Sequence, residues 1–233
     1  MKNINEIFEE LTEEIFLKLL ELSPQQGSGL GLHEYDGRVG DISLKGIENE
    51  KKVFRDFLKR LSDTDREKLS SGNKLSYDIA VWGLESSLFD YDVIQSYRKN
   101  PMNYAFMFSD IHNYISRNYA PFDERLKSVI NIIDKIPESL KTAEEILDRE
   151  IPAVLCKYAK QFSLGYEEFF KGELLEEIKS KIIDESLIAD YLKKNRDFVA
   201  NAAHDLRSPL AAIQSSVEVT VEKQRTVEEY EDL

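Results

Sequence analysis

The sequence predicts an all-α protein, with a multi-helix bundle of about seven helices up to residue 172 and then a long helix that carries a histidine. Three observations lead to this class. Apolar residues recur three and four positions apart along most of the chain. No segment alternates apolar and polar residues as a half-buried strand would. Only 10 glycines and 6 prolines occur among 233 residues, which is typical of an ordered, helix-rich protein.

The first helix is predicted from about residue 4 to the pair Ser23-Pro24. Its apolar residues form one stripe on a helix: Ile7, Phe8, Leu11, Ile15, Leu19 and Leu22. The segment GSGLGLHEYDGRVGDIS, residues 27–43, follows and holds five of the ten glycines. We expect a loop there, with Asp41 or Ser43 capping the next helix.

Helical spacing resumes after this loop. One helix is predicted through Leu44, Ile47, Phe54, Phe57, Leu58 and Leu61, and another through Leu75, Ile79 and Trp82. Four X-Pro pairs are expected to separate the later helices, because the residue before a proline disfavours the helical conformation and proline is favoured at a helix start. They are Asn100-Pro101, Ala120-Pro121, Ile136-Pro137 and Ile151-Pro152.

The chain changes character after Gly172, since residues 173–208 contain neither glycine nor proline and are rich in charge. This pattern predicts one long helix or two abutting helices. We place a domain boundary between residues 172 and 190. No internal repeat and no low-complexity tract is evident in the sequence.

Charge and cysteine content exclude several classes of protein. The formal net charge is −13, and no concentrated basic face is present, which argues against nucleic-acid binding and against an anionic membrane surface. Cys156 is the only cysteine, so neither an intrachain disulfide nor a cysteine-rich zinc site can form. The N-terminal residues lack the apolar run of a signal peptide, and no run approaches the ~20 apolar residues of a membrane span. These features predict a cytoplasmic protein without membrane insertion.

A histidine lies at the edge of an apolar seam near the end of the sequence. Two seam positions of a heptad repeat are occupied by Val199, Leu206 and Ile213 and by Ala203, Leu210 and Val217. His204 follows a seam position, so its ring can face water. A proline inside a helix costs ~3 kcal/mol or more, which favours a use for the bend at Pro209. A neutral imidazole can attack phosphorus, and Asp205 can hold its other proton.

The stretch FVANAAHDLRSPLAAI, residues 198–213, resembles the phosphoacceptor box of two-component sensor histidine kinases, in the first helix of their dimerisation domain. The resemblance covers residues 196–233. It implies that His204 is the phosphoacceptor, that Asp205 is the proton acceptor, that Ser208 positions water or the phosphoryl group, and that Pro209 lets the helix bend. Asp205 stands where glutamate is more frequent in the family.

The same resemblance implies the partners of this segment. The chain contains no ATP-binding domain of that family, so Mg-ATP would be the phosphoryl donor on a separate or missing domain. The expected partners are that kinase ATP-binding domain and the receiver domain of a response regulator. The apolar seam also predicts a homodimer through the C-terminal helix. In this reading residues 173–195 are a connecting helix, and the chain acts in a phosphorelay without a cofactor or metal site of its own.

A second resemblance covers residues 10–172. The segments GLHEYDGRVGDIS (31–43), NPMNY (100–104) and RNYAPFDERLKSVINIIDKIPESLKTAEEIL (117–147) resemble the N-terminal helical region of the bacterial family of unknown function named DUF885, whose complete members are similar to gluzincin zinc carboxypeptidases. His33-Glu34 looks like half of an H-E-x-x-H motif, but Gly37 stands three residues beyond Glu34 and no second histidine follows. His112 is alone on a predicted helix between apolar residues, and such a histidine is usually a core or edge residue without a functional role.

Two functions therefore remain open at this point. One is a phosphoacceptor protein of the histidine kinase type. The alternative is a helical scaffold or binding domain, derived from a zinc carboxypeptidase-like family, with no activity in this chain. The sequence does not decide whether the chain is a natural fusion, a fragment or an assembly artefact.

Overall fold

The computed structural model describes residues 2–196 apart from 106, 108 and 183. All regular structure within these residues is helical, so the predicted all-α class is confirmed. The described residues form two compact units, one that ends at Ser96 and one that begins at Tyr97. The boundary that we placed between residues 172 and 190 rests on a change in composition and not on contacts, and it stays a prediction.

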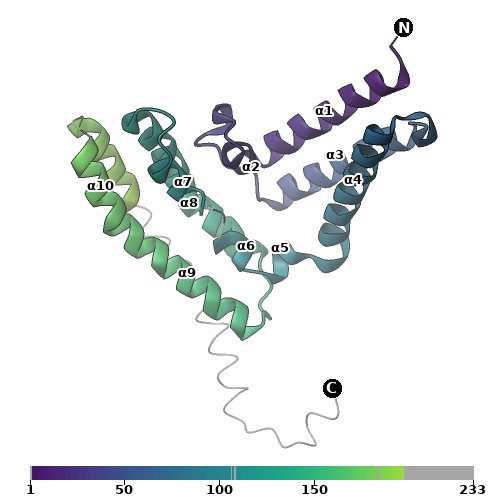
Figure 1. Ribbon diagram of the computed structural model, residues 1–233. Coiled ribbons are helices and arrows are strands. Elements are labelled where there is room, and N and C mark those ends of the chain that lie inside the picture. The colour runs from purple at the N-terminus through teal and green to yellow at the C-terminus, as the bar shows by residue number, and fades with distance from the viewer. Residues whose placement is uncertain (1, 106, 108, 183, 197–233) are drawn as a thin grey trace, which may run out of the picture. The chain divides into compact units, whose positions relative to one another are not determined.

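The long helices of unit 1 are α1, α3 and α4, which Figure 1 labels. Its elements are α1 (Ile4–Leu22), α2 (Pro24–Gly29), a 3₁₀ turn (His33–Tyr35), α3 (Leu44–Ser62), a 3₁₀ turn (Arg66–Lys68), α4 (Ser71–Phe89) and a π-helical turn (Asp90–Ile94). Asn3 and Glu6 form a capping box at the start of α1. Ser43 caps α3 by accepting a hydrogen bond from the Gly46 amide, as one of the two predicted caps.

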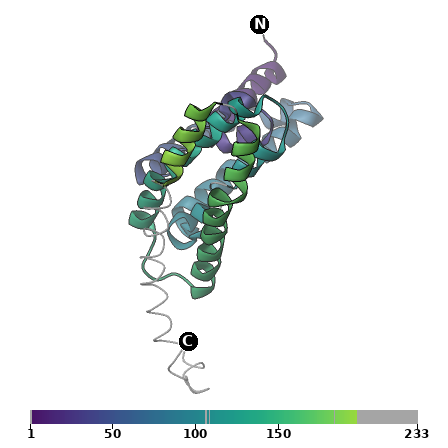
Figure 2. The ribbon, with the colours of Figure 1, turned by 90° about the vertical axis from the view of Figure 1, so that its left-hand side faces the viewer.

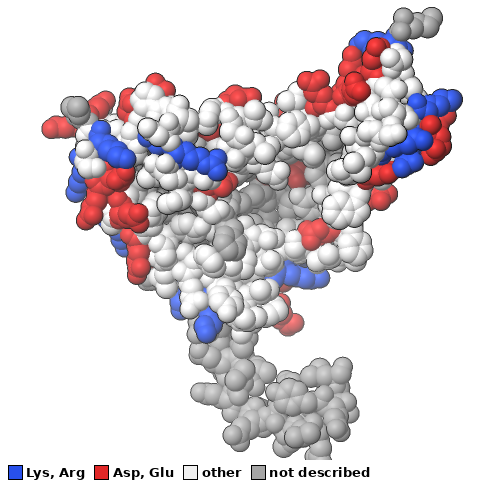
Figure 3. Space-filling model, viewed as in Figure 1, with Lys and Arg blue, Asp and Glu red and all other residues white. Residues whose placement is uncertain are grey.

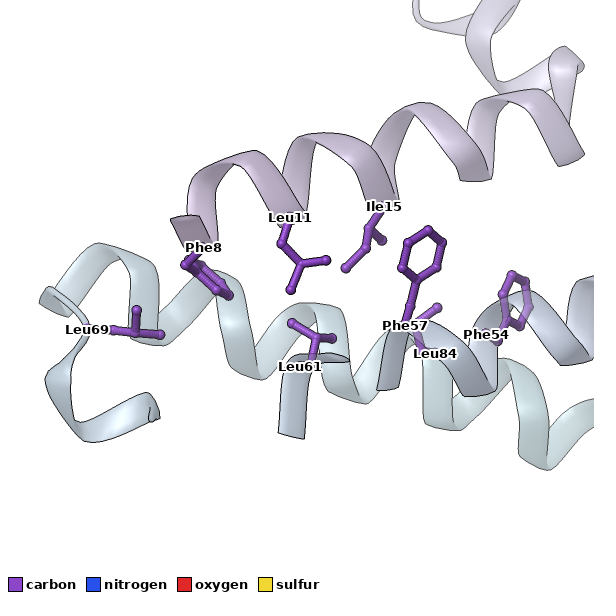
Figure 4. Packing of buried hydrophobic residues seen from close by; sticks show 8 residues of the cluster. All are labelled: Phe8, Leu11, Ile15, Phe54, Phe57, Leu61, Leu69 and Leu84. Carbon is purple, nitrogen blue, oxygen red and sulfur yellow. The ribbon is translucent and has the colours of Figure 1, made fainter. Parts of the chain in front are cut away.

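The core of unit 1 lies between α1, α3 and α4 (Figure 4). Its buried members are Phe8, Leu11, Ile15, Phe54, Phe57, Leu61, Leu69 and Leu84. The apolar stripes predicted for the first helix and for residues 44–61 supply most of these side chains. Burial of one such side chain stabilises the fold by about 1.5–3 kcal/mol, so these helices are held mainly by their apolar faces.

The apolar stripe predicted in the third helix lies on the side of that helix that faces away from the core. Leu75, Ile79 and Trp82 are in α4, as their spacing predicted, but their side chains are 62, 60 and 71% exposed. Leu84 and the partly buried Tyr77, Ala80, Val81 and Leu88 face the core instead. Since both sides of α4 are apolar, the spacing predicts a helix without showing which side the fold covers.

The glycine-rich segment 27–43 is shorter as a loop than we expected. Pro24 occupies the first turn of α2, so this short helix takes in Gly27, Ser28 and Gly29 before the chain turns. The prediction of a loop from residue 27 is therefore wrong for its first three residues. Gly31 and Gly37 have φ values of 86° and 73°, which favour glycine because it lacks a Cβ.

Unit 2 is built around α8. Its elements are α6 (Met102–Ala105), α7 (Ile111–Ser116), α8 (Phe122–Ile146), α9 (Ala153–Lys171) and α10 (Glu173–Lys181), and the short α5 (Ser96–Lys99) begins at the end of unit 1. Pro121 and Pro152 directly precede α8 and α9, as predicted. Pro137 does not separate two helices, because it lies inside α8. The cost of this interior proline is offset by the extensive burial of α8, including Ile133, Ile136 and Leu140.

Between Gly172 and residue 196 the described residues form two helices, which is the second of the two predicted arrangements. α10 lies beside α9 (Figure 1 and Figure 2) and ends at Lys181, and residues 185–196 are helical again. Tyr191 is fully buried and its hydroxyl donates a hydrogen bond of 2.6 Å to the carbonyl of Phe170. Asn195 donates to the same carbonyl at 3.1 Å. These two bonds satisfy a carbonyl in the last turn of α9, where no helical partner remains.

Acidic and basic side chains gather in mixed groups on the face shown in Figure 3, with broad uncharged areas between these groups. Most ion pairs of the described residues are exposed, and such pairs contribute ~0–1 kcal/mol each. Among the described residues, no helix combines the length and apolar character that a membrane crossing requires. The lone thiol, Cys156, is buried in unit 2, and this burial raises its pKa.

Candidate functional site

A polar cluster joins the end of α2 to the 3₁₀ turn that follows it in unit 1. The carboxylate of Asp36 accepts a hydrogen bond of 2.6 Å from the Ser28 hydroxyl, and its second oxygen lies 3.1 Å from Nδ1 of His33. The side chain of Asp36 is 10% exposed and that of His33 is 47% exposed. A carboxylate in this position orients the imidazole and leaves half of the ring open to solvent.

The order of these contacts limits the chemistry of the cluster. Ser28 gives its hydrogen bond to Asp36 and not to His33, so this contact does not make the imidazole a base for the serine. The side chains of the cluster bond to one another, which lets Asp36 tie the loop to α2.

The loop beneath this cluster is closely packed. Tyr35 is buried, and a Cβ added at Gly27 would lie 2.6 Å from its ring. The guanidinium of Arg38 lies 5.1 Å from the centre of the same ring, within the range of a cation–π contact. The segment HEYDGR therefore holds a defined conformation. No group of three or more His, Cys, Asp or Glu side chains that could hold a metal occurs among the described residues.

A second candidate site is an apolar pocket between α7 and α9 in unit 2. Its volume is about 560 Å³, and it is lined by Ile111, His112, Tyr158, Gln161, Phe162, Gly165, Tyr166 and Phe169. The rings of His112 and Phe169 lie 6.4 Å apart. Tyr158 and Phe162 remain 49 and 40% exposed, so the aromatic lining can be reached from solvent. The pocket has the size and apolar character of a small-molecule or side-chain site.

The lining of this pocket has no formal charge, and the nearby carboxylate of Asp110 acts on Tyr166 from outside the lining. None of its lining residues carries a carboxylate, ammonium or guanidinium group. The polar groups it offers are the His112 imidazole, the Gln161 amide and the hydroxyls of two tyrosines. Burial raises the pKa of Tyr166, and a hydrogen bond with Ser109 partly opposes that rise. The pocket therefore suits an uncharged group that can also make one or two hydrogen bonds.

A larger hollow, of about 680 Å³, lies between α1 and α3. Its walls carry both charges, and the guanidinium of Arg60 binds both carboxylate oxygens of Glu14 there. This pairing lowers the pKa of Glu14 through the hydrogen bond from Arg60. Because its charged groups are exposed and partly paired with each other, this hollow is a weaker candidate than the aromatic pocket.

Comparison with known proteins places the chain in a family. The family model described as "Bacterial protein of unknown function (DUF885)" matches residues 24–229, which is most of the 233 residues. The chain belongs to the DUF885 family. The sequence resemblance to DUF885 is thereby confirmed, and the match extends beyond residue 172 through the segment that contains His204.

One solved structure of similar fold is a protein described as "a putative lipoprotein of unknown function from Shewanella oneidensis". The likeness has a TM-score of 0.79 at 19% sequence identity, and covers 94% of this chain and 39% of that protein. This DUF885 chain thus spans about two-fifths of the length of the Shewanella protein. No curated protein matches the chain. The cytoplasmic location stays a prediction.

The site residues predicted from the sequence lie in a different part of this DUF885 chain. His204, Asp205, Ser208 and Pro209 all fall within residues 197–233, outside the described residues. His112 is an edge histidine, as its surroundings suggested, and it borders the aromatic pocket.

Sequence reasoning missed this pocket. The sequence feature that could have indicated it is the spacing of Tyr158, Phe162, Tyr166 and Phe169 along one side of α9. A stripe of this kind usually packs into the core, but only part of this one is buried.

Proposed function

We propose that this chain is a helical binding domain of a DUF885 protein, and that the aromatic pocket between α7 and α9 is its ligand site. The observation that supports this most is the pocket itself: an exposed aromatic wall on α9 faces His112 on α7, with no charge in the lining. A fold that needed these rings only for its core would cover them. This proposal takes up the helical scaffold or binding domain that the sequence left as the alternative function, and it adds a binding site.

The chemistry of the lining defines the ligand class. Four aromatic side chains favour an aromatic or branched apolar group, since aromatic pairs contribute ~0.5–1.5 kcal/mol beyond the burial of their area. The imidazole of His112 and the amide of Gln161 can bond a neutral backbone amide beside such a group. We therefore propose a peptide with an aromatic or branched side chain, which agrees with the resemblance of complete DUF885 members to carboxypeptidases.

Substitutions on α9 test this site. Phe162→Ala removes one aromatic wall, and Gly165→Leu fills the pocket from a glycine whose added Cβ meets no atom within 4 Å. Titration with N-acetyl-phenylalaninamide, followed by the His112 ring signals in NMR spectra, should show binding to the wild type. We expect affinity at least about tenfold weaker in both variants, since a buried aromatic contact contributes on the order of 1.4 kcal/mol or more.

The matched control is Val154→Ala, because Val154 is an exposed apolar residue of the same helix that does not line the pocket. It should bind the probe as the wild type does. Equal shifts with N-acetyl-glycinamide, or unchanged binding by Gly165→Leu, would reject the pocket as the site.

We infer a second candidate function from residues 198–213 alone. The box around His204 supports a phosphoacceptor, in which one ring nitrogen attacks the γ-phosphorus of Mg-ATP held by a separate kinase domain. A phosphorus–nitrogen bond forms, the bond to the bridging oxygen breaks, ADP leaves, and Asp205 takes the proton from the other ring nitrogen. A receiver-domain aspartate would then take the phosphoryl group. The family match spans these residues without adding support for this chemistry.

The chain has three histidines, so substituting each of them in turn tests every residue that could be phosphorylated on an imidazole. Incubation with an isolated histidine kinase catalytic domain and radiolabelled Mg-ATP should label the wild type, His33→Gln and His112→Gln. His204→Gln should remain unlabelled, because no phosphoacceptor is left in the box. Equal labelling of His204→Gln and wild type would exclude the phosphoacceptor function.

A further inference from the structure

α4 carries large apolar side chains on the side opposite the core of unit 1. We name Leu75, Ile79, Trp82 and Phe89 the α4 stripe; they are 62, 60, 71 and 55% exposed. Their spacing of four, three and seven residues keeps them on one side of the helix. The opposite side packs into the core through Leu84. A helix that is apolar on both sides normally has both sides covered.

The stripe is large enough to be an interaction surface. An aromatic side chain carries ~150–250 Å², so Trp82 and Phe89 leave roughly 250 Å² exposed between them. With Leu75 and Ile79 the patch reaches about 500 Å², a size that marks binding surfaces on soluble proteins. Two such patches pressed together would bury about 1,000 Å², which is the lower limit for a specific interface.

Small residues lie between the large ones. Gly83 follows Trp82 inside the helix, where glycine costs about 1 kcal/mol relative to alanine. A Cβ added at Gly83 would meet no atom within 4 Å, so packing within the described residues does not require a glycine there. Ser86 is exposed on the same side. A second helix that approaches the stripe would use the position of Ser86, since its large side chains need hollows to enter, and Gly83 leaves the flank of the stripe open.

We propose that the α4 stripe is a self-association surface, on which two copies of the chain pair α4 with α4 in antiparallel directions about a twofold axis. In that register Trp82 faces Ser86 of the partner subunit, and Ile79 faces Phe89 of the partner subunit. Each large side chain of the central pair thus meets a small one. The surface is self-complementary, as a twofold interface must be.

Charges at the rim set the strength of this association. Asp78 is held by Arg66 through two hydrogen bonds of 2.7 and 2.6 Å, and Asp92 by Lys51 and Arg55, so both carry a local counter-charge. Glu85 is exposed beside the stripe. In the antiparallel register it lies next to Glu85 of the partner subunit. This like-charge pair and the net charge of −13 make the dimer weak and its affinity greater at higher salt.

Sedimentation velocity of the full chain over a wide concentration range tests the proposal. Trp82 is the only tryptophan, so its fluorescence reports on the α4 stripe alone. We expect reversible dimerisation with a blue shift of the emission as protein concentration rises. Trp82→Ala should weaken dimerisation at least about tenfold. Glu85→Gln should strengthen it about fivefold, because the like-charge contact contributes on the order of 1 kcal/mol near water.

The matched control is Phe16→Ala, which removes an exposed aromatic ring of α1 outside the stripe and should leave dimerisation unchanged. Circular dichroism establishes that each variant is folded. A monomer at every concentration would overturn the proposal, whatever else covers α4 in longer family members. A dimer that survives Trp82→Ala but dissociates on Leu210→Ala would overturn it too, and would favour the C-terminal seam.

Discussion

Replacing Arg125 by methionine is expected to reduce the free energy of unfolding of unit 2 by about 3–5 kcal/mol. Arg125 is 4% exposed and lies in the first turns of α8. Its guanidinium donates to the carbonyls of Tyr114, Ile115, Arg117 and Ala120 at 2.7–3.1 Å and to the side chain of Asn118 at 3.3 Å. Methionine fills much of the volume but removes the donor of all these hydrogen bonds. Urea denaturation followed by circular dichroism measures the loss.

The same substitution should also affect the aromatic pocket. Tyr114 and Ile115 lie at the end of α7, where carbonyls have no helical partner, so Arg125 holds that helix against α8. α7 carries Ile111 and His112 of the pocket. Arg98→Met is the control, because Arg98 pairs with Asp148 at the surface and its loss should leave the free energy of unfolding nearly unchanged. Similar losses for both variants would contradict the role given to Arg125.

Gly46→Ala is expected to destabilise unit 1 by about 2–3 kcal/mol. A Cβ at this position would lie 2.2 Å from the carbonyl oxygen of Asp41 and 2.9 Å from its carbonyl carbon. These are backbone atoms, so the segment before α3 would have to move. The displacement would also disturb the Ser43 cap, whose hydroxyl accepts from the Gly46 amide at 3.0 Å. Thermal and urea denaturation give the size of the effect.

Gly72→Ala is the comparison variant, and we expect it to raise the free energy of unfolding where Gly46→Ala lowers it. Gly72 lies in the first turn of α4, as Gly46 does in α3, but a Cβ there meets no atom within 4 Å. Alanine should therefore stabilise the protein by about 0.5–1 kcal/mol through its better helix propensity. If both glycines tolerated alanine equally, the close approach of Asp41 to α3 would not exist in solution.

Local patterns in the sequence predicted much of the fold because short-range physics decides them. The helices, the Ser43 cap and the starts at Pro121 and Pro152 depend on a few neighbouring residues. Pro137 was misjudged because its penalty is outweighed by apolar contacts from distant residues, which no local pattern contains. The stripe on α4 was assigned to a helix correctly, yet its exposure depends on which of two apolar sides meets α1 and α3.

The candidate sites were harder to predict for the same reason. Asp36 bonds to Ser28 and His33 because the 3₁₀ turn brings it back to the end of α2, and composition indicated only a loop. The aromatic pocket joins His112 to Phe169, more than fifty residues apart in the chain. His204 and its neighbours are recognised by sequence alone, and their role stays a prediction.

Because Cys156 is buried, the reactivity of its thiol can be used to measure local unfolding of unit 2. The thiol is 4% exposed and its raised pKa keeps it protonated at neutral pH, so a thiol-specific reagent reacts with it only when α9 separates from its surroundings. Because the chain has no other cysteine, the reaction rate measures the transient unfolding of that region in the native protein. Local and global stability can thus be compared in the unmodified chain.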